Sequence, residues 1–404
     1  MSFDSFNLHQ RVLANIPYQT PSPIQQQSIP AVMAGRDVMG LAQTGTGKTA
    51  AFSLPIIHHL LSGTRGHVRA LIVAPTRELA QQIHDTFETF TKGTGLRSVT
   101  LYGGVSINPQ ISALQRGVDI VVACPGRLLD HVEQKTIDLS KVEMLVLDEA
   151  DQMFDMGFLP SIRRLKRYIP KQRQTLLFSA TMPAAINELA YEFLTDPTVI
   201  KIGHVAPATS VTQTLYPVAA HLKTALLVEI LKRTEIDSVL VFTRTKHGAK
   251  NVARKLESAG FKATSLQGNL SQNKRQSAMN GFRDGSIQVL VATDIASRGI
   301  DVNGISHVIN YDMPETVEAY IHRIGRTGRA DKVGEAFTLI TNENHSEVRN
   351  IERVLGKKLE QRQLQDFNYN AAAPSRGTIG QITGGRMQNE NNRRWHRSDD
   401  RRDR

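Results

Sequence analysis

The chain has 404 residues, of which 40% are hydrophobic and 22% charged, a composition that excludes a fibrous or largely disordered protein. Its formal net charge of +11 favours a polyanionic partner, either nucleic acid or an anionic membrane surface. A single cysteine, Cys124, excludes an intramolecular disulfide and a multi-cysteine metal site. Because no apolar run is long enough to span a membrane and the first residues lack a signal-peptide layout, we expect a cytoplasmic protein without membrane association.

Short aliphatic runs alternate with helical patterns along most of the chain, which predicts parallel βαβ units. In the first half we expect strands within residues 38–42, 70–75, 119–123, 144–150 and 174–181. In the second half we expect them within residues 238–243, 288–293, 307–311 and 335–340. The fold class predicted is therefore α/β, with two doubly wound domains in tandem and ligand sites at the carboxyl ends of the strands.

A weakly periodic segment separates the halves, and a polar segment ends the chain. We predict an N-terminal domain over 1–204, a linker over 205–212, a C-terminal domain over 213–370 and a flexible Arg-rich tail over 371–404. The tail has too few apolar residues to fold by itself. It is either a solubilising tail or an RNA tether, in which arginines and Trp395 would contact phosphates and bases.

The segment AQTGTGKTA (42–50) follows the first predicted strand and opens a helix, as a phosphate-binding loop does. Gly45 and Gly47 would let the backbone curl so that its N–H groups face phosphates. Lys48 would hold the β and γ phosphates, and the Thr49 hydroxyl would ligate Mg²⁺. Ala42 stands where the common pattern has its first glycine, so the loop is a variant.

The segment VLDEAD (146–151) ends another predicted strand with a pair of carboxylates. Asp148 suits Mg²⁺ binding through water, and Glu149 suits orienting the attacking water. The alternative is a solvated acidic turn. That alternative weakens because the acidic pair follows a phosphate loop by about a hundred residues.

The segment YIHRIGRTGRA (320–330) places Arg323, Arg326 and Arg329 at three-residue spacing. A basic surface stripe is one interpretation. The other is that Arg326 and Arg329 neutralise charge at the γ-phosphate as arginine fingers. In that case hydrolysis requires the two domains to close.

Together these motifs resemble those of DEAD-box RNA helicases, in the family's order and over nearly the whole predicted folded length, and within them the bacterial RhlE-like branch. The resemblance implies two tandem RecA-like domains, each a mainly parallel sheet flanked by helices. It implies an RNA-dependent ATPase with ATP and Mg²⁺ as cofactors that locally unwinds short RNA duplexes.

The resemblance also implies roles for individual residues. Tyr18 and Gln25 would contact adenine. The other nucleotide contacts would be Thr44, Gly45, Thr46, Gly47, Lys48, Thr49 and Asp301, with Thr49 and Asp148 on the metal. RNA contacts would be Pro75, Thr76, Arg77, Gly104, Pro125, Gly126, Arg127, Arg244, Thr293 and Asp294. Coupling of hydrolysis to RNA would involve Ser179, Thr181, His322 and Arg323, beside the catalytic set of Lys48, Asp148, Glu149, Arg326 and Arg329.

Three positions depart from the family pattern: Pro17, Cys124 and Gln267. Each puts a single contact in doubt. The expected partner is RNA, single-stranded or as a short duplex, with ribosome-assembly or RNA-decay proteins as candidate protein partners. We expect a monomer and leave a dimer open. Two rival functions also stay open: a DNA helicase on the same architecture, and an ATP-gated RNA clamp or chaperone with annealing activity.

Overall fold

The computed structural model describes residues 2–43, 45–202, 211–297, 304–328 and 334–373. The predicted site residues Thr44, Asp301 and Arg329 lie outside this part of the chain, as do most of the predicted linker and residues 374–404 of the predicted tail. Residues Met1–Tyr369 form one compact unit, which contains two separate sheets.

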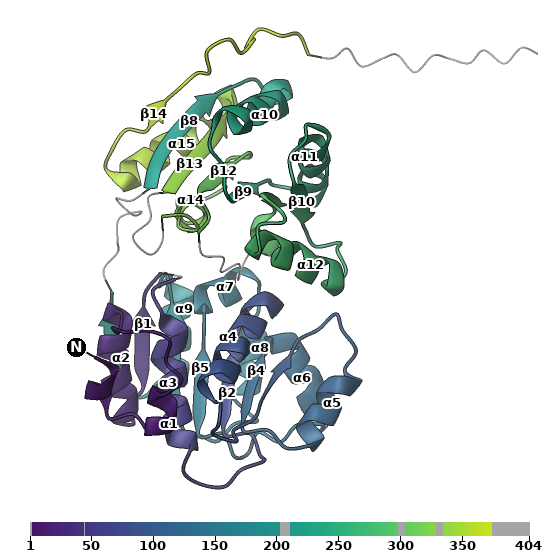
Figure 1. Ribbon diagram of the computed structural model, residues 1–404. Coiled ribbons are helices and arrows are strands. Elements are labelled where there is room, and N and C mark those ends of the chain that lie inside the picture. The colour runs from purple at the N-terminus through teal and green to yellow at the C-terminus, as the bar shows by residue number, and fades with distance from the viewer. Residues whose placement is uncertain (1, 44, 203–210, 298–303, 329–333, 374–404) are drawn as a thin grey trace, which may run out of the picture. The chain divides into compact units, whose positions relative to one another are not determined.

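The first sheet has seven strands, and every pairing in it is parallel. Its order is β3-β4-β2-β5-β6-β1-β7 (Figure 1). The strands are β1 (Val38–Leu41), β2 (Ala70–Val73), β3 (Ser98–Leu101), β4 (Ile120–Ala123), β5 (Met144–Leu147), β6 (Gln174–Ser179) and β7 (Thr198–Lys201).

Helices cover both faces of this sheet, because each parallel crossover needs one. They are η1 (Phe3–Phe6), α1 (Gln10–Leu13), α2 (Pro23–Met33), α3 (Lys48–Leu60), α4 (Arg77–Phe90), α5 (Asn108–Gln115), α6 (Pro125–Glu133), α7 (Ala150–Asp155), α8 (Leu159–Leu165) and α9 (Ala184–Phe193). Two apolar clusters fill the two faces, one involving α2, α3 and α4 and the other α6, α8 and α9.

The second sheet repeats this architecture, again with all pairings parallel, in the order β10-β11-β9-β12-β13-β8-β14. Its strands are β8 (Val211–Pro217), β9 (Val239–Phe242), β10 (Ala263–Leu266), β11 (Val289–Ala292), β12 (His307–Asn310), β13 (Gly334–Ile340) and β14 (Glu360–Gln361). Its helices are η2 (Ala220–Leu222), α10 (Lys223–Arg233), α11 (Lys246–Ser258), α12 (Gln272–Arg283), α13 (Asp294–Ser297), α14 (Val317–Ile324), η3 (Asn342–Asn344) and α15 (His345–Leu355).

The predicted α/β class is confirmed, and each of the nine predicted strand segments overlaps a strand. The central strands β2, β4 and β5 are buried at all four positions, which is why their sequences are continuous aliphatic runs. Among the described residues, no helix is both long and apolar enough to cross a membrane.

The linker prediction needs one correction. Strand β8 begins at Val211, inside the range 205–212 that we predicted as linker. Val211 is buried and pairs with Gly334 of β13, so tertiary pairing extends the strand beyond its local sequence signal.

Candidate nucleotide and RNA sites

The predicted phosphate loop lies between β1 and α3 and has the backbone that its glycines permit. Gly45 and Gly47 have φ values of +83° and +90°, a region that side-chain-bearing residues rarely adopt. Lys48 begins α3, and its buried ammonium donates a 2.9 Å hydrogen bond to the carbonyl of Ala42. The loop thus folds back over its own lysine and directs the start of α3 toward the site.

The predicted adenine motif is joined to this loop by hydrogen bonds. The Ser22 hydroxyl donates to the carbonyl of Thr46 at 2.7 Å, and the Gln25 amide nitrogen donates to the carbonyl of Gly47 at 3.1 Å. The Gln25 amide oxygen accepts from the Ser22 backbone at 2.9 Å. Both amide atoms of Gln25 therefore bind the chain itself, while Tyr18 is 52% exposed.

The acidic pair after β5 is buried: Asp148 is 2% exposed and Glu149 is 5% exposed. Burial raises the pKa of Asp148, and it raises the pKa of Glu149 to about 7 although nearby Lys48 opposes both shifts. Glu149 has a φ of +53°, and its Oε2 atom has no hydrogen-bond partner among the described residues. A solvated acidic turn is therefore excluded.

This donor set fits Mg²⁺. Among the described residues there is no group of three or more His, Cys, Asp and Glu side chains arranged to hold a metal. Mg²⁺ characteristically uses one or two carboxylates together with waters and substrate phosphates, so it does not need such a cage. Asp148, directly after β5, and Thr49, in the first turn of α3, would supply that smaller set.

Asp151 is a functional candidate that the sequence analysis did not single out. Its Oδ2 atom accepts hydrogen bonds from the Ala180 and Thr181 backbones and from the Thr181 hydroxyl, at 3.1, 2.9 and 3.1 Å. The Ser179 hydroxyl in turn accepts from the Asp151 backbone and donates to the Thr181 carbonyl. These hydrogen bonds join the acidic segment to the segment that follows β6. In the sequence, the only indication of this contact was the presence of both the DEAD segment, which ends at Asp151, and the SAT segment at 179–181.

Arg323 and Asp294 form a second pairing that the sequence did not reveal. The two Asp294 oxygens accept hydrogen bonds of 2.6 Å each from Arg323, a bidentate pair that links α14 to the first residue of α13. Arg323 also donates to Asn310 and to the Asp312 carbonyl, and it lies over the Phe242 ring. Arg323, predicted as a coupling residue, is therefore buried within the second sheet's own polar network.

Residues that follow strands of both sheets line one cavity of about 610 Å³ within the compact unit. Asp151, Thr181, Asp294, His322, Arg323 and Arg326 are among its lining residues. Burial lowers the pKa of His322, whose surroundings include Asp151 and Arg326. Arg326 also contributes a favourable electrostatic interaction with Glu149. The role of Arg326 as an arginine finger stays a prediction.

The predicted RNA contacts of the first domain gather at the carboxyl ends of β2, β3 and β4. Gly104 has a φ of +75°, and a β-carbon there would lie 2.2 Å from a guanidinium nitrogen of Arg77. Arg127 donates a 3.1 Å hydrogen bond to the carbonyl of Val105, beside Gly104. Thr76 caps α4 through the Leu79 backbone, while Pro125 and Gly126 form the first turn of α6.

The predicted RNA contacts of the second domain follow β9 and β11. Arg244 is exposed, and its backbone donates to Asp312 at 2.9 Å. Thr293 is half-buried. The carboxylate of its neighbour Asp294 accepts two hydrogen bonds from Arg323. Of the departures from the family pattern, Cys124 is buried with its pKa raised to about 12 by burial, so it is a packed residue rather than a reactive thiol.

Comparison with known families identifies the set of motifs described above. The family model of the DEAD/DEAH box helicases matches residues 22–189, and that of the helicase conserved C-terminal domain matches residues 222–331. The chain belongs to the DEAD-box helicase family. The two matches include strands of both sheets, so the resemblance is confirmed at the level of the family, whereas the RhlE-like branch stays a prediction.

Relatives of this helicase are similar over most of their length. The DEAD-box ATP-dependent RNA helicase RhpA of Helicobacter pylori is 42% identical, over 91% of this chain and 75% of the relative. The DEAD-box ATP-dependent RNA helicase CshA of Bacillus subtilis is 40% identical, over 89% of this chain and 74% of the relative.

Solved structures of family members share the fold, which confirms the tandem RecA-like architecture. S. cerevisiae Dbp5 bound to RNA and ADP BeF3 matches with a TM-score of 0.80 and 30% identity, over 89% of this chain and 95% of that one. Mss116p bound to single-stranded RNA and AMP-PNP matches with a TM-score of 0.81 and 27% identity, over 90% of this chain and 79% of that one.

Proposed function

We propose that this DEAD-box protein is an ATP-dependent RNA helicase that separates short RNA duplexes locally and remodels RNA or RNA–protein complexes. The observation that supports it best is the cavity that collects Asp151, Thr181, His322 and Arg326 beside the acidic pair. If residues of both domains are needed for ATP hydrolysis, the reaction takes place only when the two domains are close together. Binding of ATP and RNA would therefore favour closure, and hydrolysis would favour reopening.

ATP would be held by the phosphate loop and the adenine motif. The backbone N–H groups of residues 45–49 and the start of α3 would bind phosphate oxygens, and Lys48 would exchange its bond with the Ala42 carbonyl for the β and γ phosphates. Thr49 and Asp148 would hold Mg²⁺, which when bound neutralises charge on the phosphate oxygens. Gln25 would turn one amide atom from the chain to the adenine edge.

Glu149 would orient the attacking water. Its buried Oε2 atom, which has no partner among the described residues, is an acceptor available for a water proton. Because burial raises its pKa, the carboxylate is a better proton acceptor at neutral pH than an exposed glutamate. Arg326, and Arg329 outside the described residues, would stabilise the charge that develops on the γ-phosphate.

RNA would be gripped along its backbone at the carboxyl ends of both sheets. Arg77, Gly104 and Arg127 would serve the first domain, and Arg244 and Thr293 the second. Backbone contacts carry little sequence information, so substrate choice would come from elsewhere. A strand held in a bent form that a duplex cannot adopt would release its complement. The hydrogen bonds between Asp151 and Thr181 would couple the release of phosphate at the nucleotide site to a change in RNA binding.

The test is steady-state ATP hydrolysis with single-stranded RNA, with equal DNA, and with neither. We expect strong stimulation by RNA alone, and a loss of at least a hundredfold in Glu149→Gln, which keeps the shape of the side chain but removes the acceptor charge. Equal stimulation by DNA would move the function to a general nucleic-acid motor. No stimulation by either would contradict the proposal.

The rival function, an ATP-gated RNA clamp or chaperone that anneals strands, is favoured by the net charge of +11. Glu149→Gln separates the two functions. A clamp keeps its annealing activity in this variant, whereas a helicase loses repeated strand separation. Cytoplasmic location, a monomeric state and protein partners in ribosome assembly or RNA decay stay predictions.

A further inference from the structure

The end of the first domain opposite the nucleotide site carries a row of exposed cations. Six neighbouring strands of the sheet, in the order β3-β4-β2-β5-β6-β1, are each preceded by a loop with an exposed Lys or Arg. In that order the residues are Arg97, Arg116, Arg65, Lys141, Lys171 and Arg36. Strands lie about 4.8 Å apart, so the row runs about 24 Å along this end of the sheet. We call these loops the amino-end loops.

Two acidic side chains of the same loops are buried and accept hydrogen bonds from the backbone of the first domain. Asp37 accepts 2.7 Å hydrogen bonds from the Thr175 and Thr195 backbones, and Asp119 accepts 2.9 Å bonds from the Gly66 and Arg97 backbones. Both carboxylates are buried. The negative charges of Asp37 and Asp119 are therefore buried, while the neighbouring Lys and Arg side chains are exposed to solvent.

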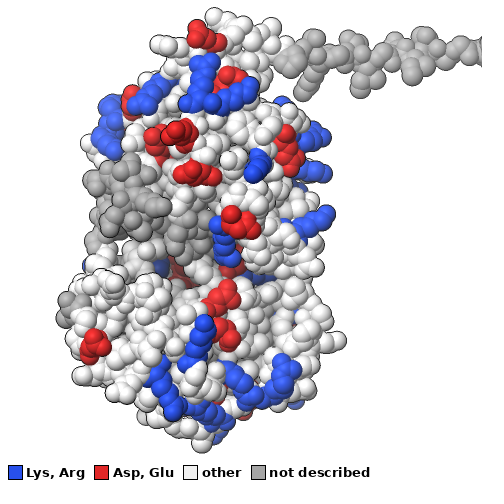
Figure 2. All heavy atoms as spheres, in the orientation of Figure 1, with Lys and Arg blue, Asp and Glu red and all other residues white. Residues whose placement is uncertain are grey.

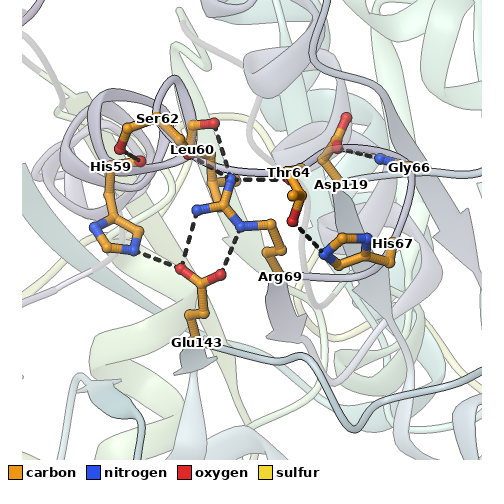
Figure 3. Close-up of polar contacts among 9 residues, drawn as sticks. All are labelled: His59, Leu60, Ser62, Thr64, Gly66, His67, Arg69, Asp119 and Glu143. Carbon is orange, nitrogen blue, oxygen red and sulfur yellow. Dashed lines mark hydrogen bonds and ion pairs between the residues drawn. The ribbon is translucent and has the colours of Figure 1, made fainter.

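The loop between α3 and β2 is held by a buried arginine (Figure 3). Arg69 donates to the carbonyls of Leu60 and Ser62 at 3.0 and 2.7 Å, and it makes a bidentate pair with Glu143. Glu143 also contacts His59 at 2.7 Å, and the Arg69 contacts hold the pKa of Glu143 below its ordinary value. The loop that carries Arg65 is therefore fixed before any partner arrives.

Glycines bring three amino-end loops into contact. Gly117 has a φ of +78°, and a β-carbon there would lie 2.7 Å from the carbonyl oxygen of Gly66 and 3.3 Å from an Arg97 nitrogen. Arg65 donates a 2.9 Å hydrogen bond to the carbonyl of Thr94. The loops before β2, β3 and β4 are therefore packed as one surface, which presents Arg65, Arg97 and Arg116 together.

The face visible in Figure 2 shows Lys and Arg side chains gathered at the outer end of this domain, with little acidic surface among them. Asp138 and Asp196 are exposed acids in loops at this end, and Asp138 is engaged by the Ser140 backbone. Tyr168 is the one large apolar side chain exposed in the amino-end loops, within the described residues. Protein interfaces depend on buried apolar anchors, and this surface has too few exposed apolar side chains to supply them. It is therefore a poor binding surface for a protein partner.

We propose that the amino-end loops bind the phosphate backbone of RNA that extends beyond the central site. Arginine and lysine side chains in a row match a polyphosphate strand, and contacts to phosphates need no particular base sequence. The predicted catalytic and RNA residues lie at the carboxyl ends of the strands, so the RNA here is a different segment of the same molecule. The inference rests on the proposed function for the identity of the polyanion.

The test compares the affinities of a roughly 10-nucleotide and a roughly 40-nucleotide unstructured RNA, measured by fluorescence anisotropy with a non-hydrolysable ATP analogue. The test variant is Arg97→Glu/Arg116→Glu/Lys141→Glu, which reverses three exposed cations in the loops before β3, β4 and β5. The control is Lys232→Glu/Lys255→Glu/Arg349→Glu, which reverses three exposed cations on helices of the second domain. Thermal melting checks that both variants fold.

We expect the test variant to bind the longer RNA about tenfold more weakly and to lower the slope of log affinity against log salt by about 2. Binding of the shorter RNA and the ATPase activity that it stimulates should stay unchanged. Unchanged affinity for the longer RNA would overturn the inference and leave an acidic protein segment as the candidate partner. An equal loss in the control would also overturn it. Wild type that binds neither RNA would instead refute the proposed function itself.

Discussion

His131 shows how a single buried side chain makes stability depend on pH. It is fully buried in α6, with its ring nitrogens 2.8 Å from the Thr136 hydroxyl and 3.3 Å from the Gln110 amide oxygen. Burial lowers its pKa, and nearby Arg127 adds to the shift although Asp130 opposes it. The folded state therefore prefers the neutral ring. Its contribution to stability is present above the unfolded pKa of about 6.5 and is lost as pH falls through the folded pKa.

We predict that His131→Gln costs about 1 kcal/mol at pH 7.5, because one hydrogen bond is remade imperfectly. Between pH 7.5 and 5, the variant should then lose less stability than wild type. Urea denaturation at both pH values measures the difference, and His247→Gln, which removes an exposed histidine, is the control. If wild type and His131→Gln lost equal stability between pH 7.5 and 5, the His131 ring would take up no proton when the protein unfolds.

At the scale of elements, two glycines with similar backbone conformations form a matched pair, one outside the phosphate loop and one within it. Gly35, after α2, and Gly47 both have positive φ, at +75° and +90°. A β-carbon at Gly35 meets nothing within 4 Å, whereas one at Gly47 would lie 2.4 Å from the Gln25 amide nitrogen. Alanine at either position costs about 1 kcal/mol of backbone strain. Only Gly47→Ala also displaces the adenine motif.

We therefore predict that Gly35→Ala keeps nucleotide affinity within twofold of wild type, while Gly47→Ala lowers it at least tenfold. Titration with a fluorescent ATP analogue measures both affinities, and urea denaturation measures the shared strain. If both variants bound nucleotide equally well, the bond between Gln25 and the Gly47 carbonyl would have no part in shaping the site.

The same elements show what the sequence could predict. The buried central strands were found because aliphatic runs such as Ile120–Ala123 are continuous. Five strands were missed, and four of them, β3, β7, β10 and β14, are edge strands, which are buried less and keep polar residues such as Ser98 and Thr264. The fifth, β8, begins within the range predicted as linker. Lys48 and Glu149 were found from local motifs. The partners of Asp151 and Arg323 were not, since each bond joins residues about thirty positions apart, and only the fold sets such distances.

At the scale of the whole molecule, two side-chain contacts join α4 of the first sheet to α12 of the second within the compact unit. Glu78 accepts a 2.8 Å hydrogen bond from Arg275, and Arg77 donates a 3.1 Å bond to Gln272. Glu78 and Arg275 are each only 11% exposed. The Gln267 and Ala296 carbonyls accept from the Arg275 guanidinium, so the second domain presents this cation in a fixed position.

A partly buried ion pair is worth more than an exposed one, and reversing one member places two like charges together. We predict that Glu78→Arg or Arg275→Glu alone lowers RNA-stimulated ATP hydrolysis about tenfold, and that the double swap restores it to within about threefold of wild type. The exposed pair Arg163–Glu192 is the control, and reversing either member should change the rate less than twofold. If the double swap is no better than the singles, Arg275 acts on RNA rather than on Glu78, because a swapped pair restores mutual attraction but not a phosphate contact.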